Sequence, residues 1–360
     1  MRVVLAPDSF KGTVTAADAA RALADGWRSV RPADHLALRP MADGGEGTLA
    51  AVLAAHPGAA PTRVGGCTGP DGRPVDGEYA LLPDGTAVVE LATASGLPLL
   101  SGPAPLTATT RGTGELVAAA LDAGARRLLI ALGGSASTDG GAGLLAALGL
   151  QLLDADGVPL PDGGGALHRA HRLDRGRFRA APPGGVRLLT DVANPLLGPA
   201  GAAAVYGPQK GASPADVELL EAGLRRLSEL LGGEPEQPGA GAAGGTAYGL
   251  TAAWGATVTP GAVAVADLLG LDAALAGADL VVTGEGRFDA TSLLGKVVGE
   301  VLSRACRAGV TARIVAGESS EEGVLTLTRL AGGPDRARTQ AVRWLRRAGA
   351  ALATEAGTRG

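Results

Sequence analysis

Short apolar runs alternate with longer amphipathic stretches at both ends of the chain. Residues 3–6, 279–282 and 312–316 have the length of buried strands, and residues 128–132 form a similar run nearer the middle. Toward the chain ends, apolar residues also recur three and four positions apart, as on helices that pack against a sheet. This alternation of strand and helix predicts an α/β fold with a parallel sheet.

Several helices are expected from their boundaries and faces. Thr15 with Asp18 resembles a capping box, so a helix is expected to begin directly after Thr15. Helices are also expected over residues 261–276 and 336–355. Residues 232–249 are rich in Gly, Pro and Ala, and they are interpreted either as a linker or as a ligand loop.

The hydrophobic period changes over residues 61–91. Apolar and polar residues alternate there, and the turn sequences Pro70-Asp71-Gly72 and Pro83-Asp84-Gly85 interrupt them. This pattern is typical of antiparallel hairpins. Because 360 residues exceed what one hydrophobic core usually supports, we expect two domains, with a boundary near residue 65.

Composition and charge exclude several classes of partner. The formal net charge of -4 gives no support to binding of nucleic acid or of a membrane surface. No apolar run approaches the length of a membrane span, and the first residues lack the long apolar core of a signal peptide. The two cysteines, Cys67 and Cys306, lie far apart in the sequence. We therefore expect a cytoplasmic protein without disulfides.

Lysine is rare in this chain. Lys and Arg together number 32, yet the lysines are only Lys11, Lys210 and Lys296, and each is next to a glycine. An ammonium group is a compact point charge, whereas a guanidinium group is a flat fork, so the two are not interchangeable at every site. The three lysines are therefore candidates for anion-binding loops.

The loop after the run at residues 128–132 is a second candidate for anion binding. Gly133, Gly134 and Ser135 follow the run, and an apolar stretch suited to a helix comes after them. A glycine-rich loop between a strand and a helix exposes backbone N–H groups beside the positive end of the helix dipole. The alternative is a tight structural turn, since a single Gly-rich loop is a weak motif.

Carboxylates stand among glycines in five loops at strand ends or turns. Such loops suit a complex of nucleotide and Mg²⁺ beside a small acceptor molecule, because carboxylates hold Mg²⁺ and can accept a hydroxyl proton. The residues are Asp8, Asp43 with Glu46, Asp139, Asp191, and Glu285 with Asp289. For Asp8, Asp43 and Asp139 a helix N-cap is the alternative interpretation.

Other familiar motifs do not occur in the sequence. Gly295-Lys296 is followed by Val297, so there is no Walker A motif, and no dinucleotide fingerprint, GxSxG or HExxH motif is present. His168 and His171 have a metal-compatible spacing but no third ligand nearby, so they are interpreted as solvated loop residues. The residues alone thus indicate an α/β protein with a Gly-rich, anion-binding cleft that uses Mg²⁺.

Seven motifs occur in the order found in the type 1 glycerate kinases, and the chain resembles that family over about residues 1–317. They span residues 6–12, 40–48, 110–115, 133–143, 191–196, 206–212, and 283–289 with 295–296. Tyr206 stands where the family pattern leads us to expect Phe, and beyond Gly317 the similarity is weak.

The resemblance implies ATP-dependent, Mg²⁺-assisted phosphorylation of D-glycerate, with 2-phospho-D-glycerate as the favoured product. It also implies two α/β domains with the active site in the cleft between them. With the boundary near residue 65, we expect one domain from residues 1–65 and 276–360. The other is an inserted mixed α/β domain over residues 66–275. A homodimer is a further expectation.

Candidate roles are distributed over these motifs. Asp191 is a general base or a metal ligand, with Asn194 beside it, and both could instead be parts of a turn. Asp8, Ser9, Lys11 and Arg287 are candidates for glycerate binding, and Lys11 also for catalysis. Candidates for nucleotide and phosphate binding are Gly133, Gly134, Ser135, Lys210, Gly284 and Lys296. Candidates for the metal are Asp191, Glu285 and Asp289.

Several rival functions stay open from the sequence. A kinase of another small hydroxy acid, or one that forms 3-phosphoglycerate, would use the same cleft. A nucleotide-binding regulator without catalysis is less favoured, because every motif that carries chemical groups is intact, and a phosphoesterase is a weaker option.

Overall fold

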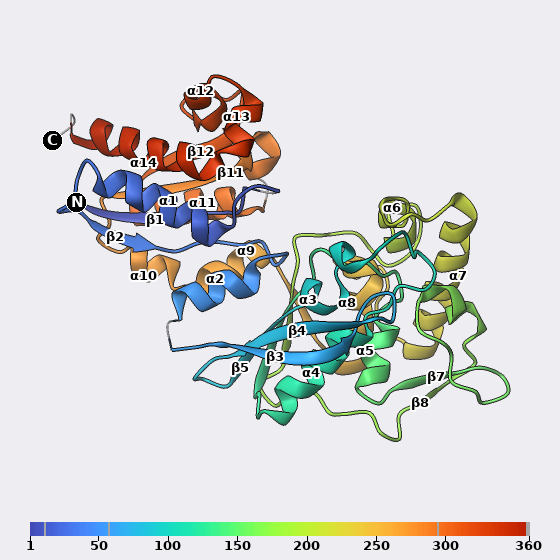
Figure 1. Ribbon diagram of the computed structural model, residues 1–360. Coiled ribbons are helices and arrows are strands. Elements are labelled where there is room, and N and C mark those ends of the chain that lie inside the picture. Colours follow the sequence, from blue (N-terminus) through green and yellow to red (C-terminus); the bar gives the residue numbers. More distant parts are fainter. Residues whose placement is uncertain (11, 57, 294, 358–360) are drawn as a thin grey trace. The chain divides into compact units, whose positions relative to one another are not determined.

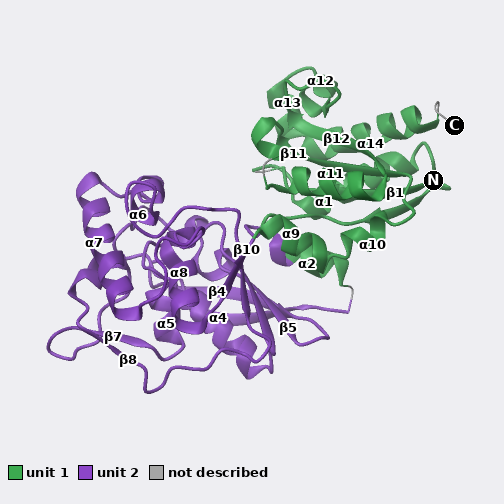
Figure 2. Ribbon diagram, turned by 180° about the vertical axis from the view of Figure 1, so that it is seen from behind, with its two compact units in different colours: residues 1–43, 50–57, 260–360 green, residues 44–49, 58–259 purple. Residues whose placement is uncertain are grey.

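The computed structural model describes residues 1–10, 12–56, 58–293 and 295–357. Lys11 therefore lies outside the described residues. The chain separates into two compact units (Figure 2). Unit 1 consists of Met1–Asp43, Ala50–Pro57 and Pro260–Gly360, and unit 2 consists of Gly44–Leu49 and Gly58–Thr259.

Unit 1 is built on a parallel sheet of five strands in the order β13-β12-β11-β1-β2 (Figure 1). All neighbouring strands in it are parallel, as the alternating pattern predicts. The strands are β1 (Arg2–Pro7), β2 (His35–Leu38), β11 (Leu280–Arg287), β12 (Thr311–Glu318) and β13 (Leu325–Thr326).

Helices cover both faces of this sheet. Val315 packs into the cluster formed with α1 (Ala16–Arg28) and α14 (Ala341–Gly357), whereas its neighbour Ala316 packs against Val298 of α11 (Val297–Ala308). Successive strand residues point to opposite faces, so the two helix layers lie on opposite sides. The other helices that lie wholly within this unit are α9 (Gly261–Leu268), α10 (Leu271–Leu275), α12 (Leu327–Ala331) and α13 (Pro334–Thr339), together with a 3-10 turn at Ala290–Leu293.

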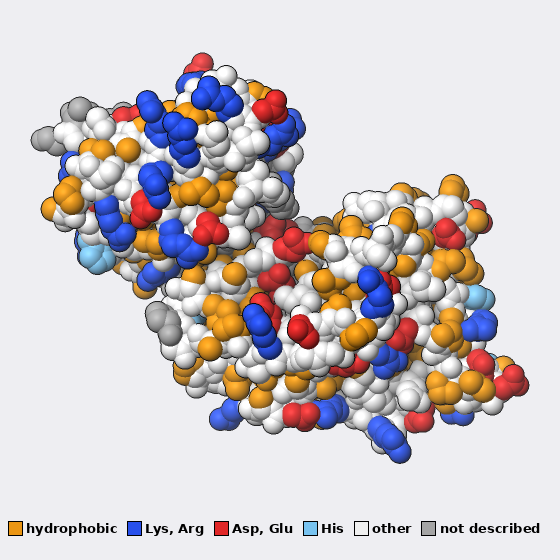
Figure 3. Space-filling view, viewed as in Figure 1, with side chains coloured by type: hydrophobic (Ala, Val, Ile, Leu, Met, Phe, Trp, Pro, Cys, Tyr) orange, Lys and Arg blue, Asp and Glu red, His pale blue; other side chains and the backbone are white. Residues whose placement is uncertain are grey.

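The outer surface of α14 is basic. Arg343, Arg346 and Arg347 are exposed, and arginine side chains gather on the face of unit 1 where α1 and α14 lie (Figure 3). Arg346 pairs with Asp25 of α1 at 3.2 Å. These side chains give unit 1 a positively charged face although the chain as a whole carries a net charge of -4.

Unit 2 contains a mixed sheet of six strands in the order β10-β9-β6-β5-β4-β3. The strands β5, β6, β9 and β10 run parallel, and β3 and β4 continue the sheet as antiparallel neighbours. The hairpins expected over residues 61–91 are therefore confirmed. Bounds are β3 (Pro61–Thr68), β4 (Pro74–Leu81), β5 (Thr86–Glu90), β6 (Arg127–Ala131), β9 (Val186–Leu189) and β10 (Thr257–Thr259).

The helices of unit 2 surround this sheet and contribute to one large apolar core. They are α3 (Ala92–Ser95), α4 (Arg111–Asp122), α5 (Ala142–Ala147), α6 (Ala202–Tyr206), α7 (Pro214–Leu231) and α8 (Ala242–Trp254). Three 3-10 turns (Leu97–Leu99, Gly164–Arg169, Pro208–Lys210) and a small hairpin of β7 (Gln151–Leu153) and β8 (Arg172–Asp174) complete the unit. Helix α2 (Thr48–Ala55) is divided between the two units after Leu49.

Several boundaries differ from those expected. The units divide at residues 57/58 and 259/260 rather than near 65 and 275, because β3 pairs with β4 of unit 2 whereas α9 and α10 pack on α11 of unit 1. The helix expected over residues 261–276 is interrupted at Gly270, which has a φ of 62°. Part of residues 232–249 forms α8 instead of a linker.

No helix among the described residues combines the length and the apolar character that crossing a membrane requires.

Candidate functional site

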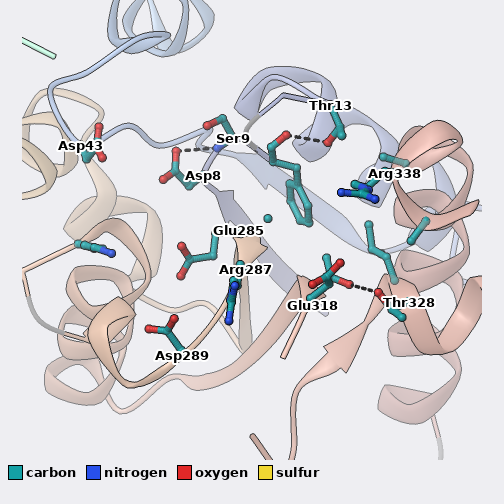
Figure 4. Close-up of a pocket in the computed structure, with 17 residues that line it drawn as sticks. Asp8, Ser9, Thr13, Asp43, Glu285, Arg287, Asp289, Glu318, Thr328 and Arg338 are labelled. Carbon is teal, nitrogen blue, oxygen red and sulfur yellow. Dashed lines mark hydrogen bonds between the residues drawn. The ribbon is translucent and has the colours of Figure 1, made fainter. Parts of the chain in front are cut away.

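A pocket of about 430 Å³ lies in unit 1, where β1, β11 and β12 end. Ligands bind at the carboxyl ends of parallel strands in open α/β sheets, so the position is the expected one. Carboxylates of Asp8, Asp43, Glu285 and Asp289 lie on one side of the pocket, and Thr13, Thr328 and Arg338 lie on the other (Figure 4).

Asp8 and Ser9 enter the pocket directly after β1. The amide of Asp8 donates to the carbonyl of Gly284 at 2.8 Å, which continues the pairing of β1 with β11 by one residue. The amide of Ser9 donates to Oδ1 of Asp8 at 2.6 Å. Asp8 thus fixes the local turn, and its carboxyl group lies at the pocket wall at the same time.

Glu285 and Arg287 reach the pocket from the last residues of β11. Their spacing of two places both side chains on one face of the strand. Arg287 is exposed, and Glu285 is half-buried. Gly284 is buried, and a Cβ added there would lie 1.8 Å from the carbonyl oxygen of Val315. The absence of a side chain at Gly284 therefore permits the close approach of β11 and β12.

Asp289 and Lys296 belong to the loop that joins β11 to α11. Hydrogen bonds from the hydroxyl and the amide of Thr291, at 2.6 and 2.9 Å, hold the pKa of Asp289 below its usual value, and the charges of Lys296 and Arg287 lower it further. Lys296 donates to the Thr291 hydroxyl at 3.4 Å. Asp289 is therefore a stable carboxylate beside two cations.

The C-terminal segment contributes pocket residues that sequence reasoning missed. Leu327, Thr328 and Arg338 line the pocket, together with Phe10 and Thr13 from the loop after β1. A helix was predicted in this segment, but no motif marks it, and so no signal in the sequence linked it to the site.

The pocket walls carry more negative than positive side chains. Among the described lining residues, five carboxylates stand against the three cations of Arg287, Lys296 and Arg338. The carboxylates are those of Asp8, Asp43, Glu285, Asp289 and Glu318. No group of three or more His, Cys, Asp or Glu side chains within the described part of the chain is arranged to hold a metal ion by itself.

The Gly-rich loop of unit 2 follows β6. The amide of Gly133 donates to the carbonyl of Gly44 at 3.1 Å, and the carbonyl of Gly134 accepts from the amide of Leu97 at 2.9 Å. Gly134 has a φ of 75°, a conformation that favours glycine. Gly133 is therefore engaged through its N–H group, and the amides of Gly134 and Ser135 are the better candidates for an anion.

Lys210 is buried beneath this loop. Its ammonium group donates to Oγ of Ser135 at 2.9 Å and to the carbonyl of Ser137 at 2.5 Å. Burial lowers the pKa of Lys210 to about 8, and the charge of Asp139 opposes that shift. The structure thus brings Lys210 and Ser135 together, as expected for one site, and gives Lys210 a contact with the loop itself.

Asp139 is not the N-cap residue that its alternative interpretation expected, since the N-caps of α4 and α5 are Thr110 and Gly141, but its contacts are structural. Its fully buried carboxylate accepts from the amide and hydroxyl of Thr110, at 2.9 and 2.7 Å. It also accepts from the amides of Gly141 and Gly143, at 3.1 and 3.3 Å. These bonds join the beginnings of α4 and α5. Burial raises the pKa of Asp139, although the four bonds oppose that effect.

Asp191 and Asn194 lie in the loop after β9. Asp191 is exposed, two residues beyond the strand end. Asn194 donates to the carbonyl of Ala200 at 2.8 Å and accepts from the hydroxyl of Tyr206 at 2.6 Å. Both ends of the Asn194 amide therefore bind within unit 2 and stabilise the loop. The tyrosine hydroxyl makes a bond that the Phe expected from the family pattern would lack.

The two histidines lie on the surface of unit 2. His168 is exposed, and its Nδ1 lies 2.9 Å from the carbonyl of Gly165. His171 is also exposed. Their interpretation as surface loop residues agrees with this placement.

Comparison with known proteins decides the family. The profile of the glycerate kinase family matches residues 3–340. The chain belongs to the glycerate kinase family. A protein of Bacillus subtilis (strain 168) named glycerate kinase is 42% identical over 308 residues, which cover 82% of this chain and 79% of the relative. An Escherichia coli (strain K12) protein named glycerate 2-kinase is 42% identical over 306 residues, which cover 82% of this chain and 80% of that protein.

A solved structure agrees over the whole chain. The crystal structure of a protein from Salmonella typhimurium LT2, proposed to be glycerate kinase 2, matches with a TM-score of 0.87 and 37% identity and covers 100% of both chains. The family resemblance and the α/β fold class are thereby confirmed. Glycerate kinases are phosphotransferases with an alcohol acceptor, so this chain is a member of an enzyme family.

Proposed function

We propose that this member of the glycerate kinase family transfers the terminal phosphoryl group of ATP to D-glycerate and forms 2-phospho-D-glycerate. The observation that carries the proposal is the 42% identity to a protein named glycerate 2-kinase over 82% of the chain. The pocket in unit 1 supports it, because residues from three of the family-like motifs line one wall of that pocket.

Glycerate is proposed to bind through its carboxylate to Arg287. A guanidinium group offers two parallel N–H donors to a carboxylate, and Arg287 is exposed at the pocket. Asp8 and Ser9 line the same pocket. The carboxylate of Asp8 would accept hydrogen bonds from the hydroxyl groups of glycerate, and the hydroxyl of Ser9 would accept or donate one. Lys11 is also proposed to bind glycerate, and this role rests on its place in the sequence motif at residues 6–12.

The charge of the pocket supports the use of Mg²⁺. Among the lining residues that the structure describes, five carboxylates against three cations disfavour the binding of glycerate and ATP, both of which are anions, and a bound cation would offset that repulsion. Mg²⁺ is usually held by one or two carboxylates together with phosphate oxygens, and Glu285 and Asp289 fit that donor set. A bound Mg²⁺ would neutralise charge that develops on the phosphoryl oxygens. Asp191 is the candidate ligand in unit 2.

The phosphates of ATP are proposed to bind the amides of Gly134 and Ser135 and the ammonium group of Lys296. Gly133 permits the close approach of the neighbouring backbone to this loop, because a Cβ on it would lie 2.3 Å from the Cα of Gly45. Lys210 acts on the phosphates through the loop that it holds. Gly284 contributes by allowing the close packing of β11 and β12.

Asp191 is proposed as the general base. An exposed carboxylate at a strand end is suited to accept the proton of the attacking hydroxyl group. The alternative role of Asp191 as a metal ligand stays in the proposal. We assign no chemical step to Asn194, because both ends of its amide are bonded within unit 2, to the carbonyl of Ala200 and to the hydroxyl of Tyr206. The proposal uses groups of both units, so substitutions in either should reduce turnover.

The size of the pocket favours one second candidate. A volume of about 430 Å³ is in the range of clefts that bury drug-sized ligands, and a three-carbon acid fills only part of it. A larger hydroxy acid is therefore the alternative substrate. A cytoplasmic location and a homodimer stay predictions from the sequence.

A substrate panel tests the proposal. Release of ADP from ATP and Mg²⁺ is measured with D-glycerate, L-glycerate, glycolate, D-lactate and tartrate as acceptors. D-glycerate is expected to give the highest kcat/KM, and no acceptor should release ADP without Mg²⁺. If another acid gave a higher kcat/KM, that acid and not glycerate would be the preferred substrate. Equal ADP release with and without an acceptor would contradict kinase activity.

A further inference from the structure

The segment Gly44–Leu49 folds with unit 2, although the residues before and after it belong to unit 1 (Figure 2). It lies against the loop that begins at Gly133, which we assign to nucleotide phosphates and call the phosphate loop. The amide of Gly133 donates to the carbonyl of Gly44 at 3.1 Å, and a Cβ on Gly134 would lie 2.8 Å from Oε1 of Glu46. The segment is thus one wall of the phosphate loop, and its position affects the position of that loop.

A single buried carboxylate anchors this segment. Glu90 accepts from the amide of Gly47 at 3.1 Å through Oε1 and from the amide of Leu49 at 3.0 Å through Oε2. Glu90 is 7% exposed. Leu49 is the second residue of α2, so Glu90 satisfies an N–H group at a helix start that has no partner within the helix.

Glu90 also stands beside the strand that leads into the phosphate loop. It is the last residue of β5 and pairs in register with Ala131, the last residue of β6. The loop begins two residues later, at Gly133. One side chain thus connects the end of β5 with the segment that covers the loop after β6.

The anchor is costly, which argues for a specific role. Burial raises the pKa of Glu90, and the negative charges of Glu46 and Glu78 raise it further, whereas the bonds from Leu49 and Gly47 lower it. An apolar residue would avoid that cost but would leave two amides without an acceptor.

We propose that Glu90 is a positioning residue of the nucleotide site: its carboxylate holds Gly44–Leu49 against Gly133 and Gly134 and thereby fixes the amides that receive phosphate. The inference rests on the proposed function, because it takes this loop as the phosphate site. Glu90 itself is not placed in contact with any substrate.

The test replaces Glu90 by Gln. Each carboxylate oxygen accepts one N–H group, so Glu90→Gln leaves one amide facing an NH₂ group. Hydrogen exchange followed by mass spectrometry is expected to show faster exchange in peptides that contain residues 44–49 and 133–135. KM for ATP should rise about tenfold with a smaller change in kcat, since an anchoring bond to a charged group is lost.

Glu115→Gln is the matched control. Glu115 also accepts two hydrogen bonds in unit 2, from the amide and the hydroxyl of Thr68 at 2.7 and 2.8 Å, but it joins α4 to β3. Exchange over residues 44–49 and KM for ATP should stay as in the wild type. Glu90→Asp, which keeps the charge on a shorter side chain, is expected to fall between the wild type and Glu90→Gln.

Two results would overturn the inference. Wild-type exchange over residues 44–49 in Glu90→Gln would refute the anchor, and faster exchange with an unchanged KM for ATP would refute the positioning role.

If neither variant folds by circular dichroism, exchange of the wild-type amides of Gly47 and Leu49 decides, because fast exchange there contradicts the anchor. Binding of a non-hydrolysable ATP analogue, measured by calorimetry, replaces KM if the wild type does not phosphorylate glycerate, so failure of the proposed function is recognised separately.

Discussion

Lys210 shows how burial changes the chemistry of one side chain. Only 5% of it is exposed, and its ammonium group is held by Ser135 and the carbonyl of Ser137. The scarcity of lysine in the sequence marked this residue as a candidate for an anion site. Its burial could not be predicted, since it depends on how residues 75 positions apart in the sequence pack together.

The buried ammonium group predicts a pH-dependent stability difference between the wild type and Lys210→Met. Burial lowers the pKa of Lys210 from 10.5 to about 8. Between these values the unfolded chain holds the proton and the folded chain has released it, so rising pH favours the folded state. The free energy of unfolding of the wild type should therefore increase relative to the variant by about 3 kcal/mol between pH 8 and 10.5. Urea unfolding at several pH values measures it, and a constant difference would mean that Lys210 is not buried as described.

Arg287 is the residue whose loss should affect glycerate most. Removal of a guanidinium–carboxylate contact costs about 1.5 to 3 kcal/mol, which corresponds to a rise of roughly 10- to 150-fold in KM for glycerate in Arg287→Ala. The melting temperature should change little, because Arg287 is exposed. Arg307→Ala is the control, since Arg307 is an exposed arginine of α11 that bonds to Ser303 at 2.8 Å. Steady-state kinetics with each variant test whether Arg287 binds glycerate. An unchanged KM for glycerate in Arg287→Ala would exclude that role.

Among the elements, α1 and α14 pack more closely than the sequence could indicate. A Cβ on Gly349 would lie 2.2 Å from the carbonyl oxygen of Leu23, and one on Gly26 would lie 1.8 Å from that of Arg346. The apolar stripe of each helix predicted a buried face, and both faces are buried. The partner of each helix was not predictable, because periodicity identifies a buried face and not what covers it.

Gly349→Ala tests this helix contact. Alanine normally stabilises a helix by about 1 kcal/mol relative to glycine. Here the methyl group would force two backbones apart, and a net loss of about 1 to 3 kcal/mol in unfolding free energy is expected. Gly357→Ala in the same helix meets only the flexible end of Arg31 and should be neutral or slightly stabilising. Thermal unfolding followed by circular dichroism compares the two, and a more stable Gly349→Ala would contradict the packing.

Local backbone conformation was the least predictable feature of the elements. Helix α8 contains three successive residues with positive φ, namely Ala243, Gly244 and Gly245. The glycines there suggested a linker or a ligand loop. A Cβ on Gly244 would instead lie 2.1 Å from the carbonyl oxygen of Ser137. These glycines therefore permit tight packing under the phosphate loop, which depends on tertiary contacts that a single sequence does not show.

For the whole molecule, the motifs predicted the family and the fold class, and the comparisons confirm both. The structure divides the candidate residues into two groups. Residues at the pocket of unit 1 include Asp8, Arg287 and Lys296, whereas the phosphate loop, Lys210 and Asp191 belong to unit 2. The sequence did not predict that the C-terminal segment contributes residues to the pocket, because no recognisable motif lies beyond residue 317.

The most direct test of the central claim is ³¹P NMR of the product formed from D-glycerate, ATP and Mg²⁺ by the intact protein. Loss of the ATP γ-phosphate signal should be matched by a new phosphomonoester signal whose coupling to a single proton identifies 2-phospho-D-glycerate. A signal coupled to two protons would identify 3-phosphoglycerate and contradict the proposed position of transfer. Inorganic phosphate as the sole new signal, or no change in the ATP spectrum, would contradict glycerate phosphorylation itself.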